Sequence, residues 1–325
     1  MLFNGSPYML NSLFYKNNQK IIPIITGPTA SGKSDFAIKL ALKYGFEIIS
    51  ADSMQIYKGL DIGTAKVSIS EQKLVPHHLI DIRFPSESYS VVNFQHDSLE
   101  ILSSKGNYLV CGGSSQYICS LLDREIYSDD QNSDLRNKLE TTYSCYSNFE
   151  LWQELNKIDN IRASQLNPND RRRVLRAIEK YKISGILPSK LNPKSNISEE
   201  FSSFLFLPIY IDNDRDLLYQ KINKRVDQMM KLGLLEEAEY CYKLDKNSEL
   251  SSTCKQAIAY KEFFPYFKHE LSLNECIDRL KINSRHYAKR QITWWKRRSD
   301  VIRLHSNDID EFLLSNRLFD ILTLY

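Results

Sequence analysis

Residues 27–34 read Gly-Pro-Thr-Ala-Ser-Gly-Lys-Ser and fit the spacing G-x-x-x-x-G-K-[ST] at every fixed position. The apolar, β-branched run 21–25 precedes this segment, and residues 35–44 follow it with helical periodicity. Strand, glycine loop and helix in this order predict a loop whose backbone N–H groups, together with Lys33, hold a phosphate, while the Ser34 hydroxyl can bind a metal. A glycine turn that binds nothing is the alternative, and both flanks argue against it. The motif does not specify which phosphate-bearing molecule the loop binds.

Short strands alternate with helical stretches through residues 21–127, and a further strand and helix follow within residues 201–325. This order predicts an α/β fold, a P-loop NTPase-like parallel sheet flanked by helices, made from these two parts of the chain. The predicted strands are 21–25, 47–50, 108–111 and 204–211.

Two segments lie outside this α/β pattern. Residues 128–200 are polar, with apolar residues at helical spacing, and predict an all-helical insertion domain. Residues 1–20 have neither the apolar core of a signal peptide nor the arginines of a transit peptide, and they predict a flexible N-terminal extension. Either Met1 or Met9 could be the start.

The composition is that of a globular protein, with 325 residues, 42% hydrophobic and 26% charged. No apolar run approaches the roughly 18 residues that a membrane helix needs. The six cysteines show no C-x-x-C pair and no metal-ligand spacing. We therefore expect a cytoplasmic protein with reduced thiols and no membrane-spanning segment.

A carboxylate follows the second predicted strand. Residues 47–50 run through Ala51 into Asp52, and ligands of open α/β sheets bind at this end of the strands. Asp52 could simply cap the turn with Ser53. It could also hold a metal through water or act as a general base, and the polar loop 59–66 that follows favours these roles.

The third predicted strand ends differently from that of an ATP-using P-loop enzyme. Such an enzyme holds magnesium with an aspartate at the end of a strand. Strand 108–111 is instead followed by Gly112, Gly113 and Ser114. His77 and His78 are adjacent and point apart, which predicts structural roles and no shared metal.

Positive charge is concentrated near the C-terminus, although the net charge is only +3. A long helix is predicted from residue 273 to 298, and it carries eight lysines and arginines between Arg279 and Arg298 with tryptophans interleaved. A solvated charged face is the alternative, but so uneven a distribution favours a phosphate-rich partner such as a nucleic acid. Residues 171–176 form a second basic cluster in the helical insertion.

Taken together, these motifs closely resemble those of the tRNA dimethylallyltransferases, the bacterial tRNA isopentenyltransferase (IPP transferase) family. The resemblance extends over about residues 21–298. The matching segments, in order, are 27–34, 52–57, 59–66, 76–79, Asn169 and Asp170 with Arg173 and Arg176, 183–185, 256–261 and 289–294.

The resemblance implies transfer of a dimethylallyl group from dimethylallyl diphosphate to N6 of the adenosine immediately 3′ of the tRNA anticodon, position 37. The products are N6-dimethylallyladenosine and diphosphate, and Mg²⁺ is the implied cofactor. The resemblance implies that Asp52 is the base, that Thr29 and Arg225 have further catalytic roles, and that Ser34 binds the metal. The residues implied to bind the diphosphate are Gly27, Pro28, Thr29, Ala30, Ser31, Gly32, Lys33 and Ser34. We expect a monomer.

The family pattern also implies contacts with the anticodon stem-loop of tRNA. The residues implied to contact tRNA, taken from the matching motif positions, are Asp52, Ser53, Met54, Gln55, Ser114, Arg136, Arg172, Arg173, Val174, Leu175, Arg176, Gln256, Ala257, Ile258, Ala259, Tyr260, Lys261, Lys289, Arg290, Gln291, Ile292, Thr293, Trp294, Trp295 and Lys296. The chain departs from the pattern at Ser115 and Ala259, where many relatives have glycine, and it lacks a C-terminal Cys/His zinc pattern.

Three alternatives stay open. A prenyltransferase acting on free AMP would need the same loop and Asp52, and only the basic surfaces argue against it. A small-molecule kinase would need an acidic strand end and would not explain the basic helix. A tRNA-binding protein without catalysis would have no use for the loop and Asp52.

Overall fold

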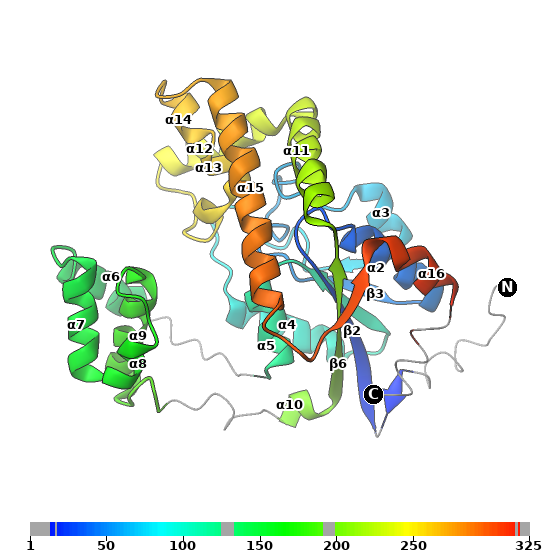
Figure 1. The fold of residues 1–325 in the computed structure, drawn as a ribbon, viewed down its shortest axis with the longest axis horizontal. Coiled ribbons are helices and arrows are strands. Elements are labelled where there is room, and N and C mark those ends of the chain that lie inside the picture. Colours follow the sequence, from blue (N-terminus) through cyan, green and yellow to red (C-terminus); the bar gives the residue numbers. More distant parts are fainter. Residues whose placement is uncertain (1–13, 17, 125–132, 191–198, 316–317, 319–325) are drawn as a thin grey trace. The chain divides into compact units, whose positions relative to one another are not determined.

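The structure, a computed structural model, describes residues 14–16, 18–124, 133–190, 199–315 and 318. The chain divides into two compact units, one made of residues 1–124 and 198–325 and the other of residues 125–197 (Figure 1). Each division lies a few residues from a predicted boundary, 127/128 or 200/201. Within the described residues no helix combines the length and the apolar character that crossing a membrane requires.

The first unit is built on one sheet with the strand order β4-β3-β5-β2-β6-β7. All of these strands pair in parallel, and β1 adds to β2 antiparallel. The parallel sheet predicted from the sequence is therefore confirmed. The strands are β1 (Tyr15–Lys16), β2 (Gln19–Thr26), β3 (Glu47–Ser50), β4 (His77–His78), β5 (Tyr108–Gly112), β6 (Phe204–Asp212) and β7 (Ile302–His305).

Both faces of this sheet are buried. Along β2, Ile22 and Ile24 belong to one hydrophobic core, whereas Ile21 and Ile25 belong to the other. Successive residues of a strand point to opposite faces, so an uninterrupted apolar run fits a strand with helices on both sides. The helices of this unit are α2 (Lys33–Tyr44), α3 (Ile69–Leu74), α4 (Val91–Ser103), α5 (Ser115–Leu122), α10 (Glu199–Ser202), α11 (Arg215–Leu232), α12 (Leu234–Lys246), α13 (Ile258–Lys261), α14 (Phe264–Phe267), α15 (Leu273–Trp295) and α16 (Ile309–Leu314).

Helices α11 and α15 lie side by side beyond the carboxyl end of β6 (Figure 1). Ile222 of α11 and Ala288 of α15 are buried in a shared cluster. Arg285 Nη1 donates to Asn223 Oδ1 at 2.6 Å. Helix α15 begins after Ser272, which forms a capping box with Glu275, and it ends three residues before the predicted position 298.

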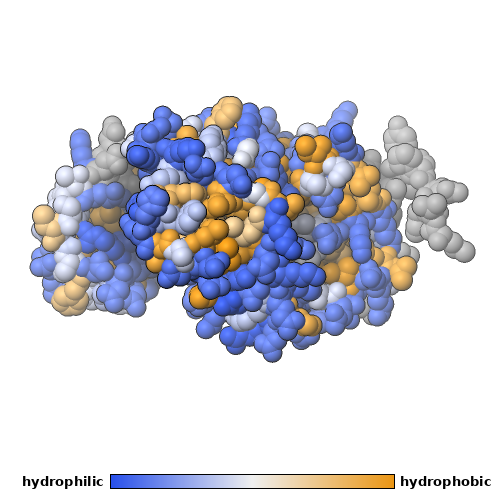
Figure 2. Space-filling model, turned by 90° about the horizontal axis from the view of Figure 1, so that it is seen from above, coloured by the Kyte–Doolittle hydropathy of each residue, from blue (hydrophilic) through white to orange (hydrophobic). Residues whose placement is uncertain are grey.

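Viewed from above, the molecule shows hydrophobic residues gathered among hydrophilic ones (Figure 2). Helices α11, α12 and α15 contribute exposed apolar side chains: Leu232 is 71% exposed, Tyr240 45% and Ile282 42%. Solvent-facing apolar groups therefore accompany the charges on these helices.

The second unit is helical in its described part. Its helices are α6 (Ser133–Thr142), α7 (Asn148–Ile158), α8 (Asn160–Ser164) and α9 (Arg171–Ser184). Their apolar faces meet in a core of their own, centred on Leu151, Leu155, Val174 and Ile178. The amphipathic spacing seen in the sequence accounts for this packing.

The prediction of a flexible extension over residues 1–20 is wrong at its C-terminal end. Strands β1 and β2 form a hairpin there, and Phe14 is 1% exposed. Its ring packs against Tyr44 and Phe46, with centroid distances of 6.2 and 4.7 Å. Burial of this one aromatic ring anchors a segment whose polar composition suggested fraying. Residues 1–13 lie outside the described residues.

Candidate active site

The phosphate loop connects β2 to α2. Gly32 is the N-cap residue of α2 and has a φ of 88°, a conformation that favours glycine. Lys33 is the first residue of the helix, and its Nζ donates to the carbonyl oxygen of Pro28 at 3.3 Å. The loop therefore presents the N-terminus of α2 and a lysine at one place, as an anion site requires.

A pocket of about 660 Å³, its open mouth included, lies over this loop. It is formed by the phosphate loop, the segment after β3, the turn after β5 and the two helices α11 and α15. Its lining includes Thr29, Lys33, Ser34, Asp52, Gln55, Thr64, Ala65, His77, Cys111, Gly112, Gly113, Arg225, Tyr287 and Gln291. The structure thus brings together Thr29, Lys33, Ser34, Asp52 and Arg225, five of the residues predicted for the site.

The positive charges of Lys33 and Arg225 in this pocket are only partly balanced by negative charge. Burial lowers the pKa of Lys33, with the nearby charge of Arg225 lowering it further, and burial lowers the pKa of Arg225 as well. Arg225 Nη1 is 3.4 Å from the Thr29 hydroxyl, and among the described residues neither cation forms an ion pair within 4 Å. The charge of Asp52 offsets this effect at both. An anion between Lys33 and Arg225 would be strongly favoured.

Asp52 combines two of the roles considered for it. Its Oδ1 accepts from the backbone N–H of Met54 at 2.9 Å, which forms the turn after β3. The residue also lines the pocket. The turn engages only one carboxylate oxygen, and within the described chain Oδ2 accepts no hydrogen bond.

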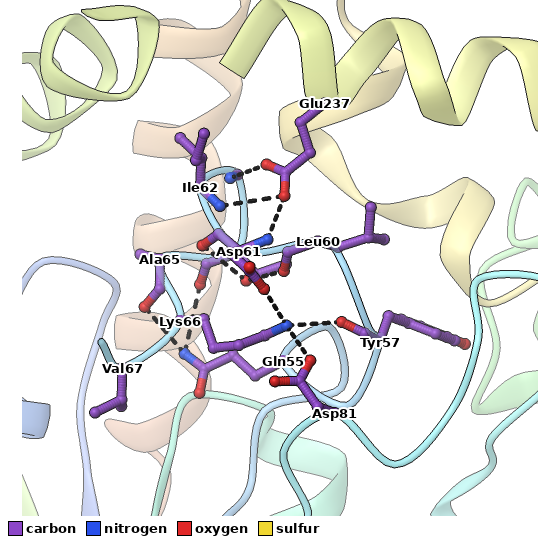
Figure 3. A network of polar contacts seen from close by, with 12 residues as sticks. Gln55, Tyr57, Leu60, Asp61, Ile62, Ala65, Lys66, Val67, Asp81 and Glu237 are labelled. Atoms are coloured by element: carbon purple, nitrogen blue, oxygen red, sulfur yellow. Dashed lines mark hydrogen bonds and ion pairs between the residues drawn. The ribbon is translucent and has the colours of Figure 1, made fainter. Parts of the chain in front are cut away.

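The polar loop 59–66 is held from two sides (Figure 3). Lys66, whose side chain is 3% exposed, donates to Tyr57 O at 2.7 Å and pairs with Asp61 and Asp81 at 2.5 Å each. Glu237 of α12 accepts from the backbone N–H groups of three successive residues, Asp61, Ile62 at 3.2 Å and Gly63 at 2.8 Å. This network fixes the loop that supplies Thr64 and Ala65 to the pocket.

Gln55 and Ser114 also support the pocket wall. Gln55 is 8% exposed, and its Nε2 donates to Ala65 O at 3.2 Å. Ser114 Oγ accepts from the backbone N–H of Ser53 at 2.9 Å. Both side chains hold the segment around Asp52 in place.

A family model described as IPP transferase matches residues 55–298. The tRNA dimethylallyltransferase of Latilactobacillus sakei is 40% identical over 291 residues, which cover 87% of this chain and 91% of the relative. That of Lactococcus lactis is 42% identical over 290 residues, covering 88% and 92%. The crystal structure of the full-length tRNA isopentenylpyrophosphate transferase from Bacillus halodurans aligns with a TM-score of 0.66 and 36% identity, covering 94% of this chain and 96% of that one.

This chain belongs to the IPP transferase family of tRNA dimethylallyltransferases. The enzyme class predicted from the sequence is thereby confirmed. A eukaryotic dimethylallyltransferase acting on tRNA shares the fold, with a TM-score of 0.74 and 29% identity over 93% of this chain and 78% of that one.

The residues predicted to contact tRNA differ in their exposure to solvent. Several of the residues predicted to contact tRNA have side chains that are buried within their own unit, and two of them, Gln55 and Gln291, line the pocket. The buried residues are Gln55 at 8% exposure, Val174 at 0%, Ala257 at 6%, Ala259 at 9%, Tyr260 at 2%, Gln291 at 4% and Trp295 at 0%. Trp295 packs against Tyr210 with a centroid distance of 5.9 Å, and so it cannot stack on a base.

Other members of the predicted tRNA surface are solvent-accessible. Lys289, Thr293 and Lys296 are exposed and recur at helical spacing along α15, with Arg290 beside them. In the second unit, Arg172 and Arg173 are exposed on α9, while Arg176 pairs with the buried Glu179 at 2.8 Å. The side chain of Arg136 lies outside the described residues. Contact of these residues with tRNA stays a prediction.

Tyr287 and Cys111 are among the pocket residues that were not predicted as site residues from the sequence. Tyr287 lies one helical turn before Gln291, and burial raises its pKa with the charge of Asp52 contributing. Cys111 ends the predicted strand 108–111, and burial raises the pKa of its thiol to about 12, which keeps it neutral. The i, i+4 spacing of Tyr287 and Gln291 could have shown that both face inward.

Proposed function

We propose that this pocket binds dimethylallyl diphosphate and that the chain transfers the dimethylallyl group to N6 of the adenosine immediately 3′ of the tRNA anticodon. The observation that carries the proposal is the pair of poorly compensated cations, Lys33 and Arg225, at the phosphate loop. A diphosphate bound there would supply negative charge that stabilises the charged forms of these two buried groups.

The reaction breaks the bond between the allylic carbon and the diphosphate oxygen. Negative charge grows on the departing oxygen, and the loop N–H groups, Lys33 and Arg225 stabilise it there. Thr29 adds a hydroxyl at the position where Arg225 approaches the loop. The phosphate loop thus binds a leaving group in this enzyme.

Hydroxyl groups in the pocket fit a magnesium ion bound together with the substrate. Thr29 and Ser34 supply hydroxyl groups to the pocket lining. The described chain has no cluster of three His, Cys, Asp or Glu side chains suited to a metal. Mg²⁺ would accordingly be held by Ser34 and diphosphate oxygens, and it would neutralise charge on the leaving group.

Asp52 is the proposed base. The exocyclic amine of adenine is a weak nucleophile because the ring shares its lone pair. As the new C–N bond forms, the Asp52 carboxylate takes the proton from N6. Its position at the end of β3, in the same pocket as Lys33, supports this role.

The acceptor is proposed to bind through the exposed residues Lys289, Arg290 and Thr293 of α15 and Lys296 at its C-cap, with Arg172 and Arg173 of the second unit contributing. Lysine and arginine on one helix face suit the phosphates of an anticodon stem-loop. We further propose that the chain acts as a monomer in the cytoplasm.

The test uses purified protein, Mg²⁺ and dimethylallyl diphosphate labelled in the prenyl group. We expect label in unmodified tRNA, none in free AMP, and loss of transfer to a tRNA in which guanosine replaces the target adenosine. Labelling of AMP in preference to tRNA would contradict the acceptor assignment.

A further inference from the structure

Gln291 joins three elements that lie far apart in the sequence. Its Oε1 accepts from the backbone N–H of Thr29 at 2.9 Å, and its Nε2 donates to the carbonyl oxygen of Gly113 at 2.8 Å. The side chain is 4% exposed; its bond to Gly113 is buried and its bond to Thr29 is partly buried. One amide thus ties the phosphate loop and the turn after β5 to helix α15.

The two partners require an amide in one orientation. Thr29 offers a donor and Gly113 an acceptor, and a glutamine side chain carries one acceptor and one donor group. A carboxylate has no donor for Gly113, and a methionine satisfies neither partner. A Cβ at residue 113 would lie 2.8 Å from Gln291 Nε2, so glycine at this position leaves room for the amide.

Each of the two Gln291 hydrogen bonds, here called the Gln291 clasp, holds a segment that contacts a residue with a proposed role in the reaction. On one side, the Thr29 hydroxyl is 3.4 Å from Arg225 Nη1. On the other, Gly113 is followed by Ser114, whose Oγ holds the backbone N–H of Ser53, next to Asp52. Helix α15 itself carries the exposed basic residues proposed for the acceptor.

We propose that Gln291 is a positioning residue that couples acceptor binding on α15 to diphosphate binding on the phosphate loop. Each ligand favours the same arrangement of α15, the loop and the turn, so each should raise the affinity for the other by the same factor. The inference rests on the proposed assignment of the pocket to the diphosphate and of α15 to tRNA.

The first test measures the dissociation constant of inorganic diphosphate with Mg²⁺, in the absence and in the presence of saturating tRNA. For the wild type we expect tighter binding with tRNA. For Gln291→Met the ratio of the two constants should fall to about one, and diphosphate alone should bind about tenfold more weakly because Thr29 and Gly113 lose their partners. Gln228→Met, at an exposed site on α11, is the matched control and should behave as the wild type.

The second test uses Gln291→Glu, because a protonated carboxyl offers the same acceptor and donor as the amide. Burial raises the pKa of a carboxyl group above about 4.3, whereas Lys33 and Arg225, which line the same pocket, lower it; under either effect, lowering the pH increases the protonated fraction. The ratio of kcat/KM for the donor, variant over wild type, should therefore rise as the pH is lowered from 8 to 6. If the side chain at position 291 has no influence on donor binding or transfer, the ratio does not change with pH.

The outcomes separate the two proposals. An unchanged tRNA effect in Gln291→Met, or a flat pH ratio in Gln291→Glu, overturns the role of Gln291. If wild type and Lys33→Ala bind diphosphate equally, the assignment of the pocket to the diphosphate is wrong, whatever the role of Gln291. Recovery of Gln291→Glu at low pH also shows that the variant is folded.

Discussion

Glu237→Ala tests whether the network of Figure 3 shapes the pocket. The carboxylate of Glu237 accepts from the backbone N–H groups of Asp61, Ile62 and Gly63. Alanine would leave all three donors without this partner. The loop they belong to supplies Thr64 to the pocket wall, so both stability and donor binding should change.

The magnitude follows from the exposure of the three donors. The bond from Asp61 is exposed, and water can replace it, whereas those from Ile62 and Gly63 are partly buried. An unsatisfied buried donor costs about 1–3 kcal/mol, so two partly buried ones should lower the free energy of unfolding by about 2–4 kcal/mol. Donor KM should rise because the loop loses its anchor.

The assay is urea unfolding of the purified chain, combined with donor KM at saturating tRNA. Glu236→Ala is the matched control, because Glu236 lies in the same first turn of α12 but is exposed. It should change the free energy of unfolding by no more than about 0.5 kcal/mol. Equal effects of the two substitutions would refute the reasoning, because only the charge at the start of α12 would then matter.

Three further predictions concern the same pocket. Gly112→Ala should prevent correct pairing of β3 and β5 and destabilise the fold by about 1–3 kcal/mol or more, because the added Cβ would lie 2.1 Å from Ala51 O. Thermal unfolding checks this against Gly45→Ala, where the added Cβ meets no atom and only the strain of the positive φ, about 1 kcal/mol, is expected. Burial lowers the pKa of Lys33, so the unfolded chain binds more protons between that pKa and about 10.4, and stability should rise with pH across this interval. The difference in unfolding free energy between wild type and Lys33→Met should show this slope, and a flat difference would contradict it. Arg225→Lys should reduce kcat about tenfold or more while tRNA affinity is kept, because lysine cannot clamp two phosphate oxygens; equal kcat would argue against a diphosphate contact.

Elements with a strong local signal were predictable. The phosphate loop has a fixed spacing, and β3 was predicted with the bounds that it has in the structure. Strand β4 was missed because two residues give no periodicity, and β7 because its residues Ile302–His305 include an arginine and a histidine and form no apolar run. Both strands form by pairing with strands distant in the sequence. Burial of Phe14 likewise depends on Tyr44 and Phe46, which no local pattern reveals.

The candidate site was predictable where one residue type implies one chemistry, as at Lys33 and Asp52. It was less so on α15, where residues 289–296 were treated as one motif. Successive residues of a helix point about 100° apart, so Lys289 and Lys296 face solvent while Gln291 and Trp295 face the core. The clasp of Gln291 became visible only once Thr29 and Gly113 were placed beside it.

The most direct test of the central claim is the single-turnover rate of prenyl transfer to tRNA by Asp52→Asn. Asparagine keeps the size of the side chain and can still accept from Met54, but it cannot take the proton from N6. We predict a rate at least about a hundredfold below the wild type, with the affinities for tRNA and for diphosphate changed by no more than a few-fold. A rate within a few-fold of the wild type would contradict the assignment of Asp52 as the base.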